Sequence, residues 1–260
     1  MNTSKPWFKR MRVTALFIKR SHGTPVTPVE AIVLQQSWGI VGDVSAQVGS
    51  PRQVLLAGTA SLDRFGLRAG DLQENLLLEG EVETFRSGQV LQIGRSAQIR
   101  LTFRCEPCAS LERLQPGLTR RIRGNRGMLA MVVQSGDVVC GAEVRPLAIE
   151  FPAIPEVVRE RFAALVARIP PGRVVSTPNL LLALGVTRSY ARAIPTWLKQ
   201  ASPALPVHRI VGADGTLLTR HLPDQQRQLQ AEGVVIVQAK VAIAHYWPAS
   251  EFYAEDPRAT

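Results

Sequence analysis

Cysteines and long apolar runs are scarce in this sequence, and each scarcity excludes a class of protein. The 260 residues include three cysteines, Cys105, Cys108 and Cys140. This low and odd number argues against a disulfide framework and fits a reducing compartment, so we expect a cytoplasmic protein. No apolar run reaches the ~18 residues that cross a bilayer, so we expect no membrane partner. The apolar run at 13–18 is too short for a secretory signal and predicts a first β-strand.

Acidic residues are outnumbered as well. The chain has 21 Asp and Glu against 31 Lys and Arg, a formal net charge of +10 at pH 7. Residues 159–209 contain eight basic residues and a single acid, Glu160. A basic stretch within helical segments is typical of a surface that contacts phosphates, so this distribution favours a nucleic-acid partner. The alternative is a protein that is merely basic.

The first part of the chain has the pattern of a mostly β domain. Residues 1–145 contain short alternating or apolar runs, such as 53–56 and 98–103, separated by turns such as Gly70-Asp71. Many short strands with regular turns predict a barrel or a sandwich. Prolines at 146, 152 and 155 then disfavour both sheet and helix, so we expect a domain at 1–147 and a linker at 148–156.

The pattern changes to helical after the linker. Apolar residues at three- and four-residue spacing predict a helix over 157–169, which Pro170-Pro171-Gly172 ends. Ser176 or Thr177 caps a second helix, with Pro178 in its first turn and Gly185 after its end. Further elements are expected as helices at 189–200 and 225–231, a turn or wing at 214–215, and a strand at 234–237. Two short helices followed by a wing are typical of a winged helix-turn-helix domain, here at 157–250 with a tail at 251–260.

One stretch of this second domain has a specific resemblance. The sequence Pro206-Val207-His208-Arg209 is accompanied, in order, by blocks at 169–176, 191–193, 226–227 and 232–234. This arrangement resembles the O6-alkylguanine-DNA alkyltransferases. The resemblance implies a winged-helix DNA-binding domain without a cofactor, whose partner is double-stranded DNA containing O6-alkylguanine.

Position 207 departs from that family because its side chain lacks the nucleophilic sulfur atom. The active enzymes carry a nucleophilic cysteine there, whereas valine has no lone pair and cannot accept an alkyl group. The sequence is therefore similar to the alkyltransferase-like proteins. The resemblance implies a protein that binds and flips O6-alkylguanine without alkyl transfer and flags it for excision-repair proteins.

The resemblance also assigns roles to individual residues. Arg192 matches the arginine that fills the gap left by the flipped nucleotide, although it could be an ordinary phosphate contact. His208 and Glu232 match the pair that activates the cysteine; here they shape the pocket or serve packing alone. We expect DNA contacts from Ser176, Thr177, Tyr190, Lys199, Arg192 and Arg209, and a lesion pocket formed by Pro206, Val207, His208, Arg220 and Glu232.

Two further departures affect DNA binding. The family has a tyrosine where this chain has Thr177, which puts a phosphate contact there in doubt. Pro195 lies within the predicted recognition helix and lacks an N–H, so it should bend that helix or shift its start.

The first domain has a resemblance of its own. The pieces at 39–43, 52–54, 70–76 and Pro107-Cys108, with glycines in between, resemble a MOSC domain, the module shared with the C-termini of molybdenum cofactor sulfurases. The resemblance implies a mostly β barrel, and Cys108 matches the proposed catalytic cysteine, a ligand for sulfur or molybdenum. Arg120, Arg121, Arg123 and Arg126 could hold the phosphate of a molybdenum cofactor or lower the pKa of the thiol. The alternative is an inert cysteine beside a solvated basic loop.

The sequence thus predicts an α+β protein of two domains, a mostly β MOSC barrel followed by a winged helix-turn-helix. Its leading function is the recognition of alkylated DNA. The alternative is a molybdenum-cofactor-dependent enzyme or sulfur carrier that uses Cys108, with modified bases as one substrate class. A winged-helix regulator that reads undamaged sequence is a third reading, and the intact pocket frame makes it the weakest.

Overall fold

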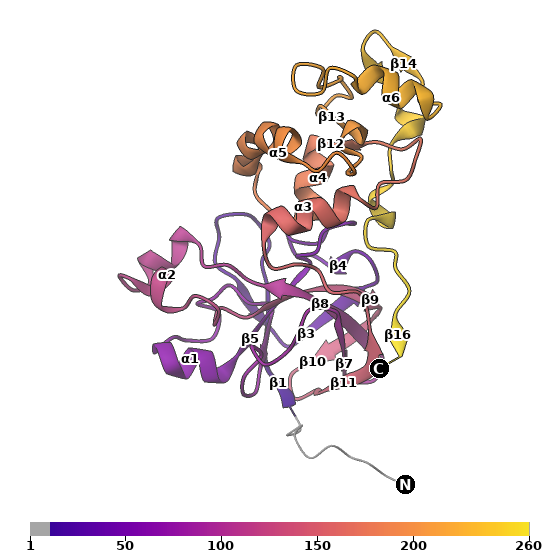
Figure 1. The fold of residues 1–260 in the computed structure, drawn as a ribbon. Helices are drawn as coiled ribbons and strands as arrows, with labels where there is room; N and C mark the ends of the chain where they lie inside the picture. Colours follow the sequence, from indigo (N-terminus) through magenta and orange to yellow (C-terminus); the bar gives the residue numbers. More distant parts are fainter. Residues whose placement is uncertain (1–10, 260) are drawn as a thin grey trace. The chain divides into compact units, whose positions relative to one another are not determined.

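The computed structural model describes residues 11–259, and the chain divides into two compact units. One unit comprises the residues up to Ile154 together with those from Glu255 onward, and the other comprises Pro155–Ala254. The first unit is rich in strands and the second is mainly helical (Figure 1). No helix among residues 11–259 is long and apolar enough to cross a membrane.

The first unit is a closed seven-stranded barrel. Its strands, in order around the barrel, are β11 (Glu143–Glu150), β7 (Gln89–Ile93), β8 (Ala97–Arg104), β9 (Met128–Gln134), β5 (Val54–Gly58), β6 (Leu76–Leu78) and β1 (Met11–Ile18). Pairing of β1 with β11, which places Met11 opposite Val144, closes the ring. Closure leaves no exposed barrel edge, and it confirms the mostly β expectation.

Smaller elements surround this ring. Strands β2 (Thr27–Val29) and β16 (Arg258–Ala259) add to β1 and β11, and a separate sheet consists of β10 (Gly136–Val139), β3 (Ala31–Gln35) and β4 (Gly39–Ile40). The short helices are α1 (Thr59–Phe65), the 3-10 turn η1 (Ala109–Arg113) and α2 (Leu118–Arg121). The parallel pairing of β5 with β6 runs across α1, a crossover that the hairpin pattern of the sequence does not predict.

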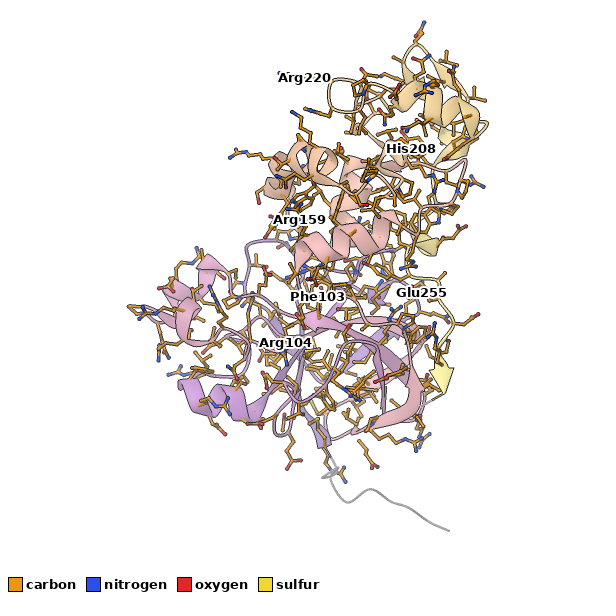
Figure 2. The ribbon with its side chains drawn as sticks, in the orientation of Figure 1. Phe103, Arg104, Arg159, His208, Arg220 and Glu255 are labelled. Carbon is orange, nitrogen blue, oxygen red and sulfur yellow. The ribbon has the colours of Figure 1, made fainter. Side chains whose placement is uncertain are left out.

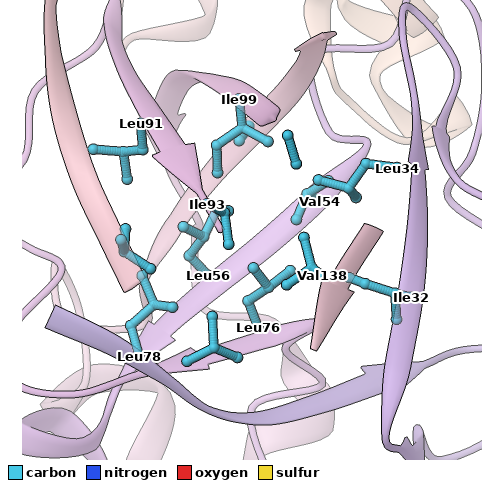
Figure 3. Packing of buried hydrophobic residues seen from close by; sticks show 14 of the residues in the cluster. Ile32, Leu34, Val54, Leu56, Leu76, Leu78, Leu91, Ile93, Ile99 and Val138 are labelled. Carbon is cyan, nitrogen blue, oxygen red and sulfur yellow. The ribbon is translucent and has the colours of Figure 1, made fainter. Parts of the chain in front are cut away.

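Branched aliphatic side chains fill the barrel. Alternate residues of β7, β8 and β5 point inward, so that Leu91, Ile93, Ile99 and Leu56 meet in one cluster (Figure 3). Arg100 is an exception, because only 1% of its surface is exposed. Its guanidinium donates to Pro152 O at 2.6 Å and pairs with Glu255 at 3.0 Å, which ties the C-terminal segment to β8.

The first residues of the linker expected at 148–156 belong to a strand in the structure. Strand β11 continues to Glu150, and its pairing with β7 shifts register between Pro146 and Glu150. A proline is tolerated in a strand where an irregularity removes the need for its N–H. Within the expected tail at 251–260, Arg258–Ala259 form strand β16, which pairs with Ile149 and Glu150.

The second unit is built from short helices around a small apolar core. Its elements are α3 (Val158–Val166), β12 (Val175–Ser176), α4 (Thr177–Leu184), η2 (Arg188–Ala193), α5 (Ile194–Gln200), η3 (Val207–Arg209), β13 (Ile210–Val211), α6 (Gln225–Ala231), β14 (Ile236–Val237), β15 (Lys240–Val241), η4 (Ile243–His245) and η5 (Ala249–Glu251). The structure thus has helix-turn-helix and hairpin elements where the sequence predicts a winged domain. Together with the barrel they make the chain α+β.

The predicted caps of α4 are present. The Ser176 Oγ accepts from the N–H of Asn179 at 3.4 Å, Pro178 lies in the first turn, and Gly185 ends the helix with φ of 65°. The single helix expected at 189–200 is wrong. The segment is a 3-10 turn up to Ala193 and an α-helix from Ile194, because Pro195 has no N–H and fits the first turn of a helix better than its interior.

The wing is a two-stranded hairpin. Strands β14 and β15 pair across a turn in which Gln238 and Ala239 both have positive φ, 48° and 59°. The predicted turn at Asp214 packs beside it, since Asp214 pairs with Lys240 at 2.6 Å. Positive φ at both turn residues matches the right-handed twist of the two strands.

Gly127 offers a test of the barrel's packing. Its φ is +108°, and a Cβ on it would lie 2.0 Å from Leu56 O. We expect Gly127→Ala to destabilise the barrel by more than ~2 kcal/mol, from backbone strain together with the clash. Gly124→Ala is the matched control, because its φ is +79° but nothing lies within 4 Å of its Cβ position. Urea unfolding followed by circular dichroism measures both; equal losses would contradict the role of the clash.

Candidate functional site

A cavity of about 500 Å³ lies in the second unit. Two segments line it, residues 201–209 and a set on and before α6 that comprises His221, Leu222, Pro223, Asp224 and Gln228. Pro206, Val207 and His208, which the sequence analysis assigned to a lesion pocket, are all in this wall. The volume is within the range of pockets that hold small molecules.

A hydrogen-bond network behind this wall centres on Glu232. Its Oε1 lies 2.8 Å from His208 Nε2 and 2.7 Å from Arg209 Nη2. Its Oε2 accepts from Arg209 Nε at 3.0 Å and from the N–H of Gly172 at 3.0 Å. The bidentate Arg209 contact is the strong form of a carboxylate–guanidinium pair. The carboxylate therefore joins three segments that are distant in the sequence.

The charge state of Glu232 fixes the proton on His208. Burial acts to raise the pKa of Glu232, but hydrogen bonds from Arg209, His208 and Gly172 N–H lower it to about 2. Because the carboxylate is ionised at neutral pH, His208 Nε2 must be the donor in their contact. The second ring nitrogen, Nδ1, is then the acceptor in the neutral imidazole.

Gln225 holds the loop from the other side. This fully buried amide donates to His208 O at 3.0 Å and to Ile210 O at 2.6 Å, and its Oε1 accepts from Leu218 N at 2.5 Å. The sequence interpretation missed Gln225, as it missed His221 in the pocket wall. The helical spacing of the sequence could have predicted that Gln225 is buried. It lies one helical turn before the buried Leu229, on the same face of α6.

Three of the predicted site residues lie in surroundings that the sequence does not predict. Arg209, expected on DNA, is only 13% exposed and is held by Glu232 and by Ile169 O at 2.5 Å. Ser176, also expected on DNA, is 5% exposed and caps α4. Arg220, expected in the pocket, is exposed (Figure 2) and is not part of the lining, whereas His221 and Leu222 are.

The remaining predicted DNA contacts differ in exposure. Arg192 and Lys199 are exposed, in η2 and α5. Thr177 is half-buried at the start of α4. Tyr190 is half-buried and its ring centroid lies 6.3 Å from that of Trp197. Arg192 and Lys199 are thus the two of the six that present an accessible cation.

The candidate thiol in the barrel unit is Cys108. It is exposed, and its Sγ lies 2.8 Å from Ser110 Oγ. Burial acts to raise the pKa of Cys108, but the Ser110 hydrogen bond and the charge of Arg126 lower it overall. A lowered thiol pKa increases the thiolate fraction, which is the nucleophilic and metal-binding form.

A small cavity near this thiol has a different cysteine in its wall. It measures about 150 Å³ and is lined by Lys19, Ser45, Arg52, Leu55, Gln73, Asn75, Cys105, Arg126 and Leu129. Cys108 and the arginines at 120, 121 and 123 are absent from this lining, as far as residues 11–259 are concerned. Arg121 instead donates to Gln115 Oε1 at 2.7 Å.

This cavity contains only part of the residue set that the resemblance assigns to a molybdenum cofactor. The cavity is smaller than the ~300 Å³ at which cofactor pockets begin, and Arg126 is the one of the four expected arginines that lines it. In the part of the chain that the structure describes, no three His, Cys, Asp or Glu side chains cluster as a metal site. Within the predicted cofactor residues, the thiolate of Cys108 is the one soft ligand for a metal.

Comparison with known proteins assigns each unit to a class. Residues 30–145 match the model of the MOSC domain, and residues 158–234 match the DNA binding domain of 6-O-methylguanine DNA methyltransferase. The chain is thus a fusion of a MOSC domain with an alkyltransferase-like DNA-binding domain. No curated protein matches it.

Solved structures share parts of this arrangement. The YuaD protein from Bacillus subtilis is 15% identical, with 52% of this chain and 94% of that chain covered and a TM-score of 0.47. YiiM from Geobacillus stearothermophilus is 15% identical, with 84% and 99% covered and a TM-score of 0.44. S. pombe Atl1, in complex with damaged DNA containing O6-carboxymethylguanine, is 25% identical, with 35% and 94% covered and a TM-score of 0.32. These TM-scores are low, so the assignment rests on the family models.

The lowered pKa of Glu232 predicts a pH dependence of stability. A carboxyl whose folded pKa is about 2 and whose ordinary pKa is 4.5 stabilises the fold fully above pH ~5, and this contribution is lost as the pH falls towards 2. Glu232→Gln leaves Arg209 without its counter-charge, so we expect it to be less stable than the wild type at pH 6, with a difference that narrows towards pH 2.5. Urea unfolding at several pH values measures this; a difference independent of pH would contradict it.

Proposed function

We propose that the second unit recognises O6-alkylguanine in DNA by holding the flipped base in its pocket, without transferring the alkyl group. The observation that carries this proposal is an intact pocket frame around Val207. Glu232, Arg209 and Gln225 hold the loop of His208, while the wall at position 207 has no nucleophile. Such a site binds a base and performs no covalent step.

Arg192 is the residue that we assign to the DNA gap. It is exposed in η2, immediately before the helix that Pro195 starts. Extruding a base costs a few kcal/mol of stacking and pairing, and an inserted guanidinium offsets part of that cost. Lys199, exposed on the following helix, supplies a phosphate contact that does not depend on the lesion. The bound, distorted duplex would then be the species that excision-repair proteins detect.

Fluorescence anisotropy with matched duplexes tests this function. At one stated salt concentration, we expect the duplex with O6-methylguanine to bind at least ~10-fold tighter than the duplex with guanine, because only the lesion gains the pocket contacts. Arg192→Ala should remove most of this preference. Arg159→Ala, which removes an exposed charge from α3, is the matched control and should preserve it. No alkyl label should reach the protein. Equal affinities for both duplexes would refute the proposal.

A second candidate function belongs to the barrel unit. The exposed thiol of Cys108, with its lowered pKa, favours a sulfur carrier. In this scheme the Cys108 thiolate attacks the outer sulfur of a donor persulfide, a Cys108 persulfide forms, and the donor leaves as a thiolate. The arrangement of the cavity favours a sulfur carrier over the alternative that the MOSC resemblance implies, a cofactor-dependent enzyme that acts on modified bases.

Mass spectrometry after incubation with a small-molecule persulfide tests this candidate. We expect one added sulfur atom on the peptide of Cys108, most rapidly above the lowered thiol pKa because the thiolate is the attacking form. Cys108→Ser should abolish the product. Cys140→Ser, at the other exposed cysteine, should leave it unchanged. Labelling of both exposed cysteines to the same extent would argue against a dedicated carrier.

A further inference from the structure

Residues 109–125 form a small, arginine-rich part of the barrel unit, which we call the arginine lobe. It comprises the 3-10 turn η1 and helix α2, and α2 lies at one side of the barrel (Figure 1). Its exposed cations are Arg113, Arg120, Arg121 and Arg123. The lining of the small cavity includes none of these four described residues. The arginine lobe is therefore a surface separate from that cavity.

Apolar side chains fix the arginine lobe to the barrel. Leu111, Leu118 and Ile122 are at most 1% exposed and belong to one core cluster with residues of α1 and β6. A polar contact adds to this packing, because Gln115 Nε2 donates to Phe65 O at 3.1 Å. The exposed arginines thus stand on a fixed backbone, which reduces the conformational entropy lost when a partner binds.

The arginine lobe contains one acidic residue, Glu112, and both of its carboxylate oxygens are engaged. Oε2 accepts from the N–H of Gly117 at 2.7 Å, and Oε1 accepts from the N–H of Thr119 at 2.9 Å. A carboxylate that accepts from the first N–H groups of a helix stabilises that end. This acid therefore serves the start of α2.

The exposed arginines of the lobe have few partners of their own. Arg121 donates to Gln115 Oε1, a neutral acceptor, at 2.7 Å. Among residues 11–259, no carboxylate lies within ion-pair distance of Arg113, Arg120 or Arg123. The arginine lobe therefore presents a positive charge that its own surroundings do not compensate.

The composition of the arginine lobe favours duplex DNA as its partner. All of its cations are arginines, whose planar guanidinium matches a phosphate group and is favoured for nucleic-acid recognition. The chain also contains a DNA-binding domain in its second unit. Once that unit holds a duplex, the effective concentration of DNA phosphates at a second basic surface of the same chain is raised.

We propose that the arginine lobe is a second DNA-contacting surface, which holds the sugar–phosphate backbone of double-stranded DNA without reading its sequence. Arg120 and Arg123 are the residues that we assign to phosphate contacts, as charge-assisted N–H donors to phosphate oxygens. The barrel unit then adds affinity that does not depend on the lesion. This role requires that the second unit bind DNA, and it does not require that a base be flipped.

The salt dependence of DNA binding by the full chain tests this role. Fluorescence anisotropy is measured over a series of salt concentrations with an undamaged duplex of ~40 base pairs, which offers ~80 phosphates. We expect Arg120→Gln/Arg123→Gln to reduce the slope of log Kd against log salt by about 2, because two phosphate contacts are lost. If circular dichroism shows that this variant is not folded, Arg120→Gln alone should reduce the slope by about 1.

The same change of charge elsewhere on the barrel unit is the matched control. Arg95 and Arg145 are exposed, in the turn after β7 and in β11, and these strands lie away from α2 (Figure 1). Arg95→Gln/Arg145→Gln lowers the net charge by the same amount and should reduce the slope by less than ~0.5, because no phosphate contact is lost. Arg120→Lys/Arg123→Lys keeps the charges and should keep most of the slope.

Equal slopes for Arg120→Gln/Arg123→Gln and the control variant would overturn the proposal. So would a lobe variant that keeps its slope on DNA and loses binding to vesicles containing phosphatidylglycerol, since the arginine lobe would then be a membrane surface. The preference for O6-methylguanine over guanine is a separate readout, and the lobe variant should leave it unchanged. A wild type without that preference but with the expected change of slope would refute lesion recognition and support the arginine lobe.

Discussion

The carboxylate of Glu232 is the interaction on which the pocket of the second unit depends. Gly172, the His208–Arg209 loop and the end of α6 are separate in sequence and meet at its two oxygens. A half-buried ion pair is stable only when its remaining donors are also satisfied. Arg209 meets this condition because it additionally donates to Ile169 O. Gln225 completes the arrangement by binding the backbone carbonyls of the same loop.

This network does not require a particular side chain at position 207. None of the hydrogen bonds to Glu232 involves the side chain at position 207, so a valine there leaves the loop in place. His208 donates to the carboxylate through Nε2. Val207 packs in the pocket wall but cannot act as a nucleophile, because its side chain has no lone pair.

The barrel shows a comparable separation between scaffold and chemistry. Cys105 and Cys108 are three positions apart, yet one faces a cavity lined by cations and the other is exposed beside Ser110. Arg126 links the two, because it lines the cavity of the first and lowers the pKa of the second. The two thiols therefore have distinct chemical environments, and a function assigned to one does not transfer to the other.

The sequence by itself determined the two domains, their α+β class, the helix caps around Ser176 and Gly185, and the absence of a nucleophile at Val207. These features depend on local pattern and on the identity of single side chains, which a sequence states directly. Tertiary structure alone decided that Arg209 pairs with Glu232, that Ser176 is buried, and that Arg220 is not part of the pocket lining. It also decided which cysteine faces the cation-lined cavity. Each of these outcomes depends on contacts between residues far apart in the chain, and a side chain's partner is set by that packing and not by its neighbours in sequence.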